Sequence, residues 1–139
     1  MLRRLLARLR GKPAVRPLQL RGRPQIRREK AYAADSGYVY QYTYEGYEDT
    51  ARDSLDGRDY VFRCTSDRAA HFLIVVFAPE ESFATWERRA ERELNEVERY
   101  AVVKMSLFEI FDDSAHLREN FVGTLSEDDV DRQVEALDL

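Results

Sequence analysis

Aromatic and polar residues alternate along residues 38–45, and this alternation predicts a β-strand. Successive side chains of a strand point to opposite faces, so a period of two gives each face its own kind of residue. One face carries Tyr38, Tyr40, Tyr42 and Tyr44, and the other carries Val39, Gln41, Thr43 and Glu45. Residues 58–67 alternate in the same way and predict a second strand, which the polar segment 46–57 joins to the first as a long hairpin connection.

A continuous apolar run at residues 72–77 predicts a third strand, buried on both faces. Helical periodicity follows it, because apolar residues recur every three or four positions over residues 79–97 and charged residues fill the other side. Pro79 suits the first turn of a helix, where its missing N–H would have no partner. The segment therefore predicts the longest helix, with a solvated charged face. Its apolar stripe consists of Phe83, Trp86, Ala90, Leu94 and Val97.

Residues 100–111 return to a pattern that predicts a strand, with a bulge near Ser106 where the apolar face changes. Ser126, followed by three acidic residues, predicts the start of a short helix. The resulting order, β-β-β-α-β-α, has more strands than crossover helices. The sequence thus predicts an α+β fold. Its mainly antiparallel four-stranded sheet carries one long amphipathic helix packed on one face and a short C-terminal helix.

Charge divides the chain into two parts of opposite sign. Residues 1–30 contain eleven basic side chains and one acidic side chain, whereas residues 31–139 contain eleven basic and twenty-five acidic ones. The formal net charge of −4 hides this contrast. A charged tail beside a domain of opposite charge is typical of a segment that binds a partner. We therefore predict a basic, largely extended N-terminal arm at residues 1–34 and an acidic α+β domain at residues 35–139.

Three interpretations of the basic arm are open. It binds nucleic acid by neutralising phosphates, or it binds an anionic membrane surface, which the amphipathic stretch at residues 2–10 would suit. In the third interpretation it is a disordered, solvated tail, which charge attraction could fold back onto the acidic domain. Among the anionic partners, RNA is slightly favoured over a membrane. The arginines expected to bind the anionic partner are Arg3, Arg4, Arg8, Arg10, Arg21, Arg23, Arg27 and Arg28.

The row of tyrosines at residues 38–44 has two interpretations. On an exposed sheet face, the rings could stack on the bases of single-stranded RNA. Beneath a helix, the same rings would belong to the core, with their hydroxyls at its rim. The opposite face carries Gln41, Thr43 and Glu45 and is better suited to water. The position in the core is therefore favoured.

Few residues suggest catalysis or metal binding. Asp112, Asp113 and His116 follow the last predicted strand, and carboxylates beside a histidine can perform acid–base chemistry, so they are weak candidates for the site of a small hydrolase. Cys64 alternates with aromatic residues, which favours a buried thiol over a nucleophile activated by His71. A single cysteine excludes a disulfide framework and a zinc ribbon. The sequence predicts no metal site and no cofactor.

The favoured function is that of a non-enzymatic binding or adaptor protein. Its domain would contact a protein partner or form a homodimer, while residues 1–30 engage nucleic acid or an anionic membrane surface. The alternatives are a dimeric chaperone-like or secretion-accessory protein and a small hydrolase. No apolar run reaches the roughly 18 residues of a transmembrane helix, and arginines interrupt the N-terminal leucines. We therefore expect a cytoplasmic protein.

Overall fold

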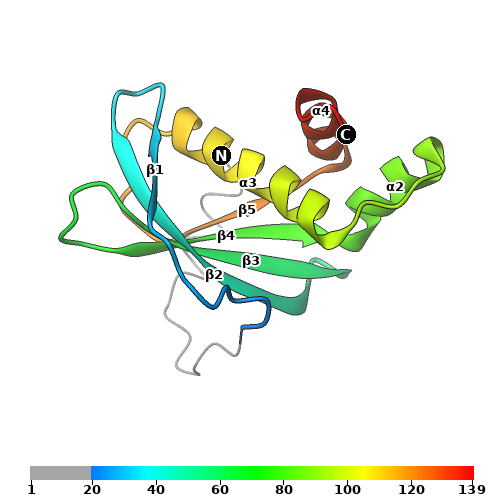
Figure 1. Cartoon of the computed structure of the whole chain (residues 1–139), viewed down its shortest axis with the longest axis horizontal. Coiled ribbons are helices and arrows are strands. Elements are labelled where there is room, and N and C mark those ends of the chain that lie inside the picture. The colour runs from blue at the N-terminus through cyan, green and yellow to red at the C-terminus, as the bar shows by residue number, and fades with distance from the viewer. Residues whose placement is uncertain (1–19) are drawn as a thin grey trace.

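A five-stranded sheet with helices on one face forms the protein (Figure 1). The structure is a computed structural model that describes residues 20–139. In chain order the strands are β1 (Lys30–Ala33), β2 (Val39–Arg52), β3 (Leu55–Thr65), β4 (Phe72–Pro79) and β5 (Phe121–Thr124). The helices are α2 (Glu80–Ala90), α3 (Glu96–Asp113) and α4 (Glu127–Ala136).

The sheet is larger and more mixed than the sequence predicts. Its order is β1-β2-β3-β4-β5, and neighbouring strands are antiparallel except for β4 and β5, which are parallel. The α+β class is confirmed, whereas the four-stranded, mainly antiparallel sheet is only partly right. Two short strands, β1 and β5, join the three predicted ones. The predicted strand at residues 100–111 is wrong, because these residues belong to a helix.

The second half of α3 occupies residues 100–111. Val103, Leu107 and Phe111 are fully buried at a spacing of four residues, as one face of a helix requires. Asn95 caps this helix: its side chain accepts the N–H of Glu98, whose carboxylate accepts the N–H of Asn95. Such a capping box satisfies N–H groups that the first turn leaves without partners. Neither α3 nor any other helix within residues 20–139 is long and apolar enough to cross a membrane.

The helix predicted over residues 79–97 is shorter than expected. α2 ends at Ala90, because Glu91 adopts a left-handed conformation with a φ of 52°. Arg99 then joins the two helices, since its guanidinium lies 3.0 Å from the carboxylate of Glu80 and 3.2 Å from that of Glu87. The side chains of Arg99 and Glu87 are mostly buried, so water screens their pairing only weakly.

β2 and β3 form one long hairpin in place of the predicted polar connection. β2 continues to Arg52 and β3 begins at Leu55, which leaves only Asp53 and Ser54 between them. Both have a positive φ, as the type I′ turns of two-residue hairpins require. The polar residues 46–57 are therefore the ends of two strands. Arg52 pairs across this hairpin with Asp59 at 2.7 Å.

A β-bulge changes which residues of β2 face the helices. The register of the β2–β3 pairing shifts between Tyr44 and Gly46. Tyr44 and Tyr47 consequently lie on the same side of the sheet, and both rings are close to Tyr60. The φ of Gly46 is 117°, a conformation that residues with a Cβ atom rarely adopt. Glycine is therefore required at this point of the strand.

The tyrosine row lies mainly under the helices, as the favoured interpretation predicts. Tyr40 is fully buried, its ring stacks on Phe111 at a centroid distance of 4.3 Å, and its hydroxyl accepts the backbone N–H of Leu117. Tyr42 is 4% exposed. Tyr38, which lies just before β2, is 41% exposed. The core position is confirmed for Tyr40 and Tyr42.

Residues 20–29, which we call the edge segment, precede β1 and lie along the part of β2 that β1 does not reach. β1 pairs only with Val39–Tyr42, and further along β2 the backbone of Arg21 exchanges two hydrogen bonds of 2.8 Å with Tyr47. Residues 20–34 of the predicted arm thus contribute the edge segment and a strand to the sheet. The amphipathic stretch at residues 2–10, with its four arginines, lies outside the described residues.

Candidate functional site

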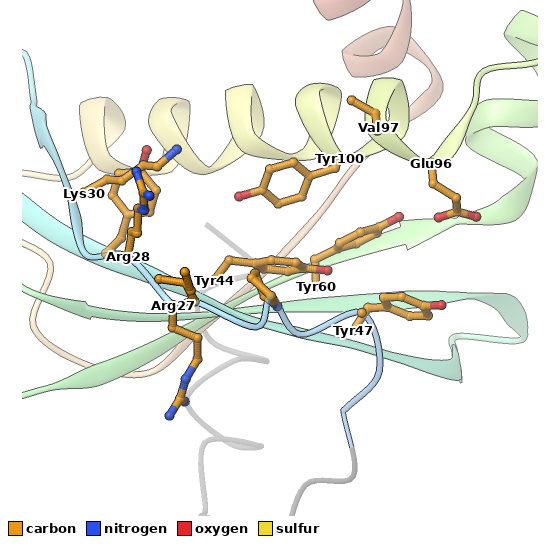
Figure 2. A pocket seen from close by; sticks show the side chains of 13 residues that line it. Arg27, Arg28, Lys30, Tyr44, Tyr47, Tyr60, Glu96, Val97 and Tyr100 are labelled. Atoms are coloured by element: carbon orange, nitrogen blue, oxygen red, sulfur yellow. The ribbon is translucent and has the colours of Figure 1, made fainter.

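Five tyrosines line an open pocket of about 650 Å³ between the sheet, α3 and the edge segment (Figure 2). We call it the tyrosine pocket. An open pocket with mainly aromatic walls and a few polar groups is the usual form of a small-molecule site. The tyrosines are Tyr42, Tyr44 and Tyr47 from β2, Tyr60 from β3 and Tyr100 from α3.

The bulge in β2 and the position of α3 bring these rings together. The centroid of the Tyr44 ring lies 4.7 Å from that of Tyr100 and 6.4 Å from that of Tyr60. Tyr47 lies 6.0 Å from Tyr60 on the same side of the sheet. Without the extra residue of the bulge, strict alternation would place Tyr47 on the opposite face. The pocket therefore depends on a one-residue irregularity in one strand.

Two apolar side chains of the pocket are strongly exposed. Ile26 of the edge segment is 71% exposed and Val97 of α3 is 77% exposed, although both line the pocket. A ligand with an apolar body would remove part of this surface from water, which is favourable by about 25 cal/mol per Å². These two residues thus add an apolar surface to the aromatic walls.

Burial keeps the phenols of four pocket tyrosines protonated at neutral pH. Burial is the main cause that raises the pKa of Tyr100 to about 12, and it also raises the pKa values of Tyr42, Tyr44 and Tyr60 above the ordinary 10.0. A protonated phenol can donate one hydrogen bond and accept others. The pocket therefore offers hydrogen-bond donors between flat apolar surfaces.

We expect the protein to lose stability as the pH rises from about 10 towards 12. Over this range the phenols of the unfolded chain ionise, whereas Tyr100 in the folded protein, with its pKa near 12, stays protonated. The folded state then holds more protons than the unfolded state, so its stability falls, while below pH 10 this contribution does not vary. Urea unfolding at several pH values measures the fall. The variant Tyr100→Phe should show a smaller one, and an equal fall would contradict the assignment to Tyr100.

The two ends of the tyrosine pocket differ in charge. Figure 2 shows Arg28 and Lys30 at one end and Glu96 at the other. Glu96 accepts a 2.7 Å hydrogen bond from Arg58, so its charge is balanced within the protein. Arg28 and Lys30 form no ion pair with any residue of the described part of the chain. One end of the pocket is therefore cationic.

Three of the arginines predicted to bind an anionic partner instead form ion pairs with carboxylates of the domain. Arg21 pairs with Asp49. Arg23 and Arg27 both pair with the buried carboxylate of Glu45, at 3.3 and 2.8 Å, and Figure 2 shows Arg27 pointing away from the pocket. The edge segment thus lies against the acidic domain through its arginines, a contact that the third interpretation of the arm allows. Arg3, Arg4, Arg8 and Arg10 lie outside the described residues, and Arg28 lines the pocket.

The weak candidates for hydrolysis have separate partners. Asp112 accepts hydrogen bonds from the Tyr32 hydroxyl at 2.7 Å and from the backbone N–H of Asp35 at 2.9 Å. His116 stacks on Tyr38 at 3.8 Å, and its Nε2 lies 2.8 Å from the Ser66 hydroxyl. None of Asp112, Asp113 and His116 lines the tyrosine pocket. A hydrolytic role for them stays a prediction that these contacts do not support.

Cys64 is a buried thiol, as predicted. It is fully buried, and burial raises the pKa of its thiol above the ordinary value, so it is a poor nucleophile at neutral pH. His71 is exposed and lies near the other face of the sheet, where it lines a smaller pocket with Arg63 and Asn120. In the part of the chain that the structure describes, no group of three histidine, cysteine or acidic side chains could hold a metal ion.

Sequence reasoning missed most of the tyrosine pocket, although two signals for it were present. A glycine inside a strand pattern indicates a bulge, and Gly46 is the residue that brings Tyr47 into the pocket. An asparagine followed three residues later by a glutamate indicates a helix start, and Asn95 with Glu98 would have placed Tyr100 on a helix. The approach of the edge segment to the pocket had no such local signal.

Comparisons with known proteins add no relative to this description. No protein-family model, curated protein or solved structure significantly matches the chain.

Proposed function

We propose that this chain is a non-enzymatic binding protein whose ligand occupies the tyrosine pocket. The observation that carries the proposal is the convergence of five tyrosines, from two strands and a helix, around an open pocket of about 650 Å³. Aromatic rings supply a large contact area at low entropic cost, and their hydroxyls supply hydrogen bonds. The ligand is thus a molecule with a flat apolar body that also accepts hydrogen bonds.

Binding is a better match to the pocket than catalysis. The phenols of Tyr44 and Tyr100 have raised pKa values, so they donate hydrogen bonds at neutral pH but are not ready to remove a proton. Its one carboxylate, Glu96, is held by Arg58. A general base would need an unpaired carboxylate or a histidine near the tyrosines. The lining residues include neither.

The charge pairs of the edge segment favour the pocket over the arm as the place where a partner binds. Arg21, Arg23 and Arg27 already contact carboxylates of the domain. An anionic polymer would have to replace these contacts. Arg28 and Lys30, in contrast, line the end of the pocket and form no ion pair with a carboxylate of residues 20–139. Binding of RNA or a membrane through residues 1–30 stays a separate prediction. It is less well supported than binding in the pocket.

We expect N-phenyl-1-naphthylamine, a neutral aromatic dye that fluoresces when it leaves water, to bind in the tyrosine pocket. Tyr100→Ala should weaken this binding about tenfold, because the contact of one aromatic ring contributes on the order of 1–2 kcal/mol. Val97→Asp, a change at a 77% exposed position, should weaken it as well without affecting the fold. Fluorescence titration measures both effects.

The matched control is Tyr38→Ala, which removes a tyrosine that does not line the pocket. It should leave the affinity for the dye unchanged. If the protein fails to bind the dye, or if all three variants bind it equally well, the tyrosine pocket is not the binding site and the proposed function is wrong.

A further inference from the structure

Two of the three lysines of this chain lie near the cationic end of the tyrosine pocket: Lys30 lines it, and Lys104 lies one turn of α3 after Tyr100. The chain contains nineteen arginines but only Lys12, Lys30 and Lys104. Lys30 belongs to β1 and Lys104 to α3, yet the two ammonium groups are close enough to repel each other. Like charges are rarely held so close unless something compensates for their repulsion. The fold therefore builds a cationic pair from two distant parts of the sequence.

No carboxylate among residues 20–139 neutralises this pair. The ion pairs of the described residues use other cations, and none involves Lys30, Lys104 or the neighbouring Arg28. The absence is notable in a domain where acidic side chains outnumber basic ones by more than two to one. Burial and the charge of Lys30 both lower the pKa of Lys104, so the repulsion has an electrostatic cost. A bound anion would remove this cost.

The lysines are placed so that an anion between them would carry its body into the pocket. Lys30 lies directly across from Tyr42 in the β1–β2 pairing. Lys104 lies four residues after Tyr100 on α3, which puts both on the same face of the helix. The Lys104 ammonium is also 5.9 Å from the centroid of the Phe108 ring, which lies 5.7 Å from that of Tyr42. Each lysine is therefore adjacent to a tyrosine of the pocket.

We infer that Lys30, Lys104 and Arg28 form an oxyanion site at one end of the tyrosine pocket, and that the ligand is an aromatic monoanion whose ring system lies among the tyrosines. The inference rests on the proposed function, since it names the class of ligand that the same pocket takes. An aromatic body is favoured over an alkyl chain because the walls offer ring faces and phenol hydroxyls. The acidic domain repels anions in general, so a local cluster of unpaired cations is the favoured place for an anion to bind to it.

Two dyes that share one ring system test the inference. 8-Anilinonaphthalene-1-sulfonate carries an oxyanion on the skeleton of N-phenyl-1-naphthylamine, which is neutral. We expect the wild-type protein to bind the sulfonate at least about tenfold more tightly, as one charge-assisted hydrogen bond would provide. Salt at 0.5 M should reduce this preference, because it screens charges at the pocket, while leaving the affinity for the neutral dye unchanged.

Lysine variants assign the preference to the pair. Lys30→Gln and Lys104→Gln should each weaken binding of the sulfonate about tenfold and leave binding of the neutral dye unaltered. Arg118→Gln makes the same change of net charge at an exposed residue that does not line the pocket and is the matched control, with both affinities expected to stay at the wild-type level. Lys30 is exposed, so its replacement should not affect folding.

The outcomes separate the inference from the proposed function. If the neutral dye binds in a manner that depends on Tyr100 but the sulfonate binds no more tightly, the pocket is a binding site without an anion site, and the inference is wrong. The same conclusion follows if Lys30→Gln and Lys104→Gln leave the affinity for the sulfonate unchanged or weaken both dyes equally. If neither dye binds, both the inference and the proposed function fail.

Discussion

Phe111→Ala is expected to destabilise the protein by roughly 3–5 kcal/mol, the usual cost of removing a buried phenylalanine. The side chain of Phe111 is fully buried near the end of α3. Its ring stacks on Tyr40 at 4.3 Å and lies 6.0 Å from Tyr32 and 6.4 Å from Tyr42. The substitution would leave a cavity between α3 and two strands, because the large aromatic neighbours cannot close it without leaving their own contacts. Urea unfolding at neutral pH measures the loss.

The control for this prediction lies on the same helix. Val97 is 77% exposed, so Val97→Ala should change the free energy of unfolding by less than about 0.5 kcal/mol. A loss below about 1 kcal/mol for Phe111→Ala would contradict the packing of α3 against β1 and β2. It would also argue against a helix at residues 100–111, because the joint burial of Val103, Leu107 and Phe111 is what indicates that helix.

Gly46→Val is expected to release the edge segment from β2 and to cost on the order of 3 kcal/mol. The φ of 117° at Gly46 is unfavourable for valine. A Cβ atom at this position would also lie 2.5 Å from the carbonyl oxygen of Arg21 and 3.0 Å from the Cβ of Leu20. Because backbone cannot yield as a flexible side chain does, the edge segment has to move away. Trypsin should then cleave after Arg21, Arg27 and Arg28 faster than in the wild-type protein.

Gly37→Val separates the effect of the backbone conformation from that of the clash. Gly37 also has a positive φ, of 95°, but a Cβ atom there would meet no atom within 4 Å. This variant should lose about 1–2 kcal/mol from strain alone, with no faster cleavage in the edge segment. Gly46→Val should also weaken binding of the neutral dye, because the edge segment carries Ile26 to the pocket. Equal cleavage of the two variants would show that the edge segment is not held at Gly46.

The sequence was most informative where one local pattern dominates. The strands around residues 38–45, 58–67 and 72–77 and the Ser126 cap of α4 follow from alternation, apolar runs and capping chemistry, and the structure has all of them. Residues 100–111 were misassigned because apolar residues at both two- and four-residue spacing occur in this stretch, and only the buried set decides between them. β1 and β5 were missed because strands of four residues are too short to show a period.

The candidate site was predicted less completely than the fold. Alternation identified Tyr42 and Tyr44, but the bulge at Gly46 depends on the pairing of β2 with β3, and the edge segment reaches β2 through residues more than 20 positions apart, Arg21 and Tyr47. The proximity of Lys30 to Lys104 depends on the pairing of β1 with β2 and on the helical conformation of residues 100–111. Both were outside the sequence-based prediction. The described part of the basic arm provides one wall of the pocket, and the charge asymmetry along the chain did not indicate that position.

The edge segment also bears on the solubility of the protein. β2 is a strand of 14 residues, and β1 pairs with only its first four. An uncovered strand edge presents free N–H and C=O groups to which another chain can add, which is a common route to aggregation. The backbone bonds of Arg21 to Tyr47 occupy part of this edge, and the charged side chains of Arg21 and Arg23 flank it. The residues that form a wall of the tyrosine pocket thus also protect the sheet from pairing with a second molecule.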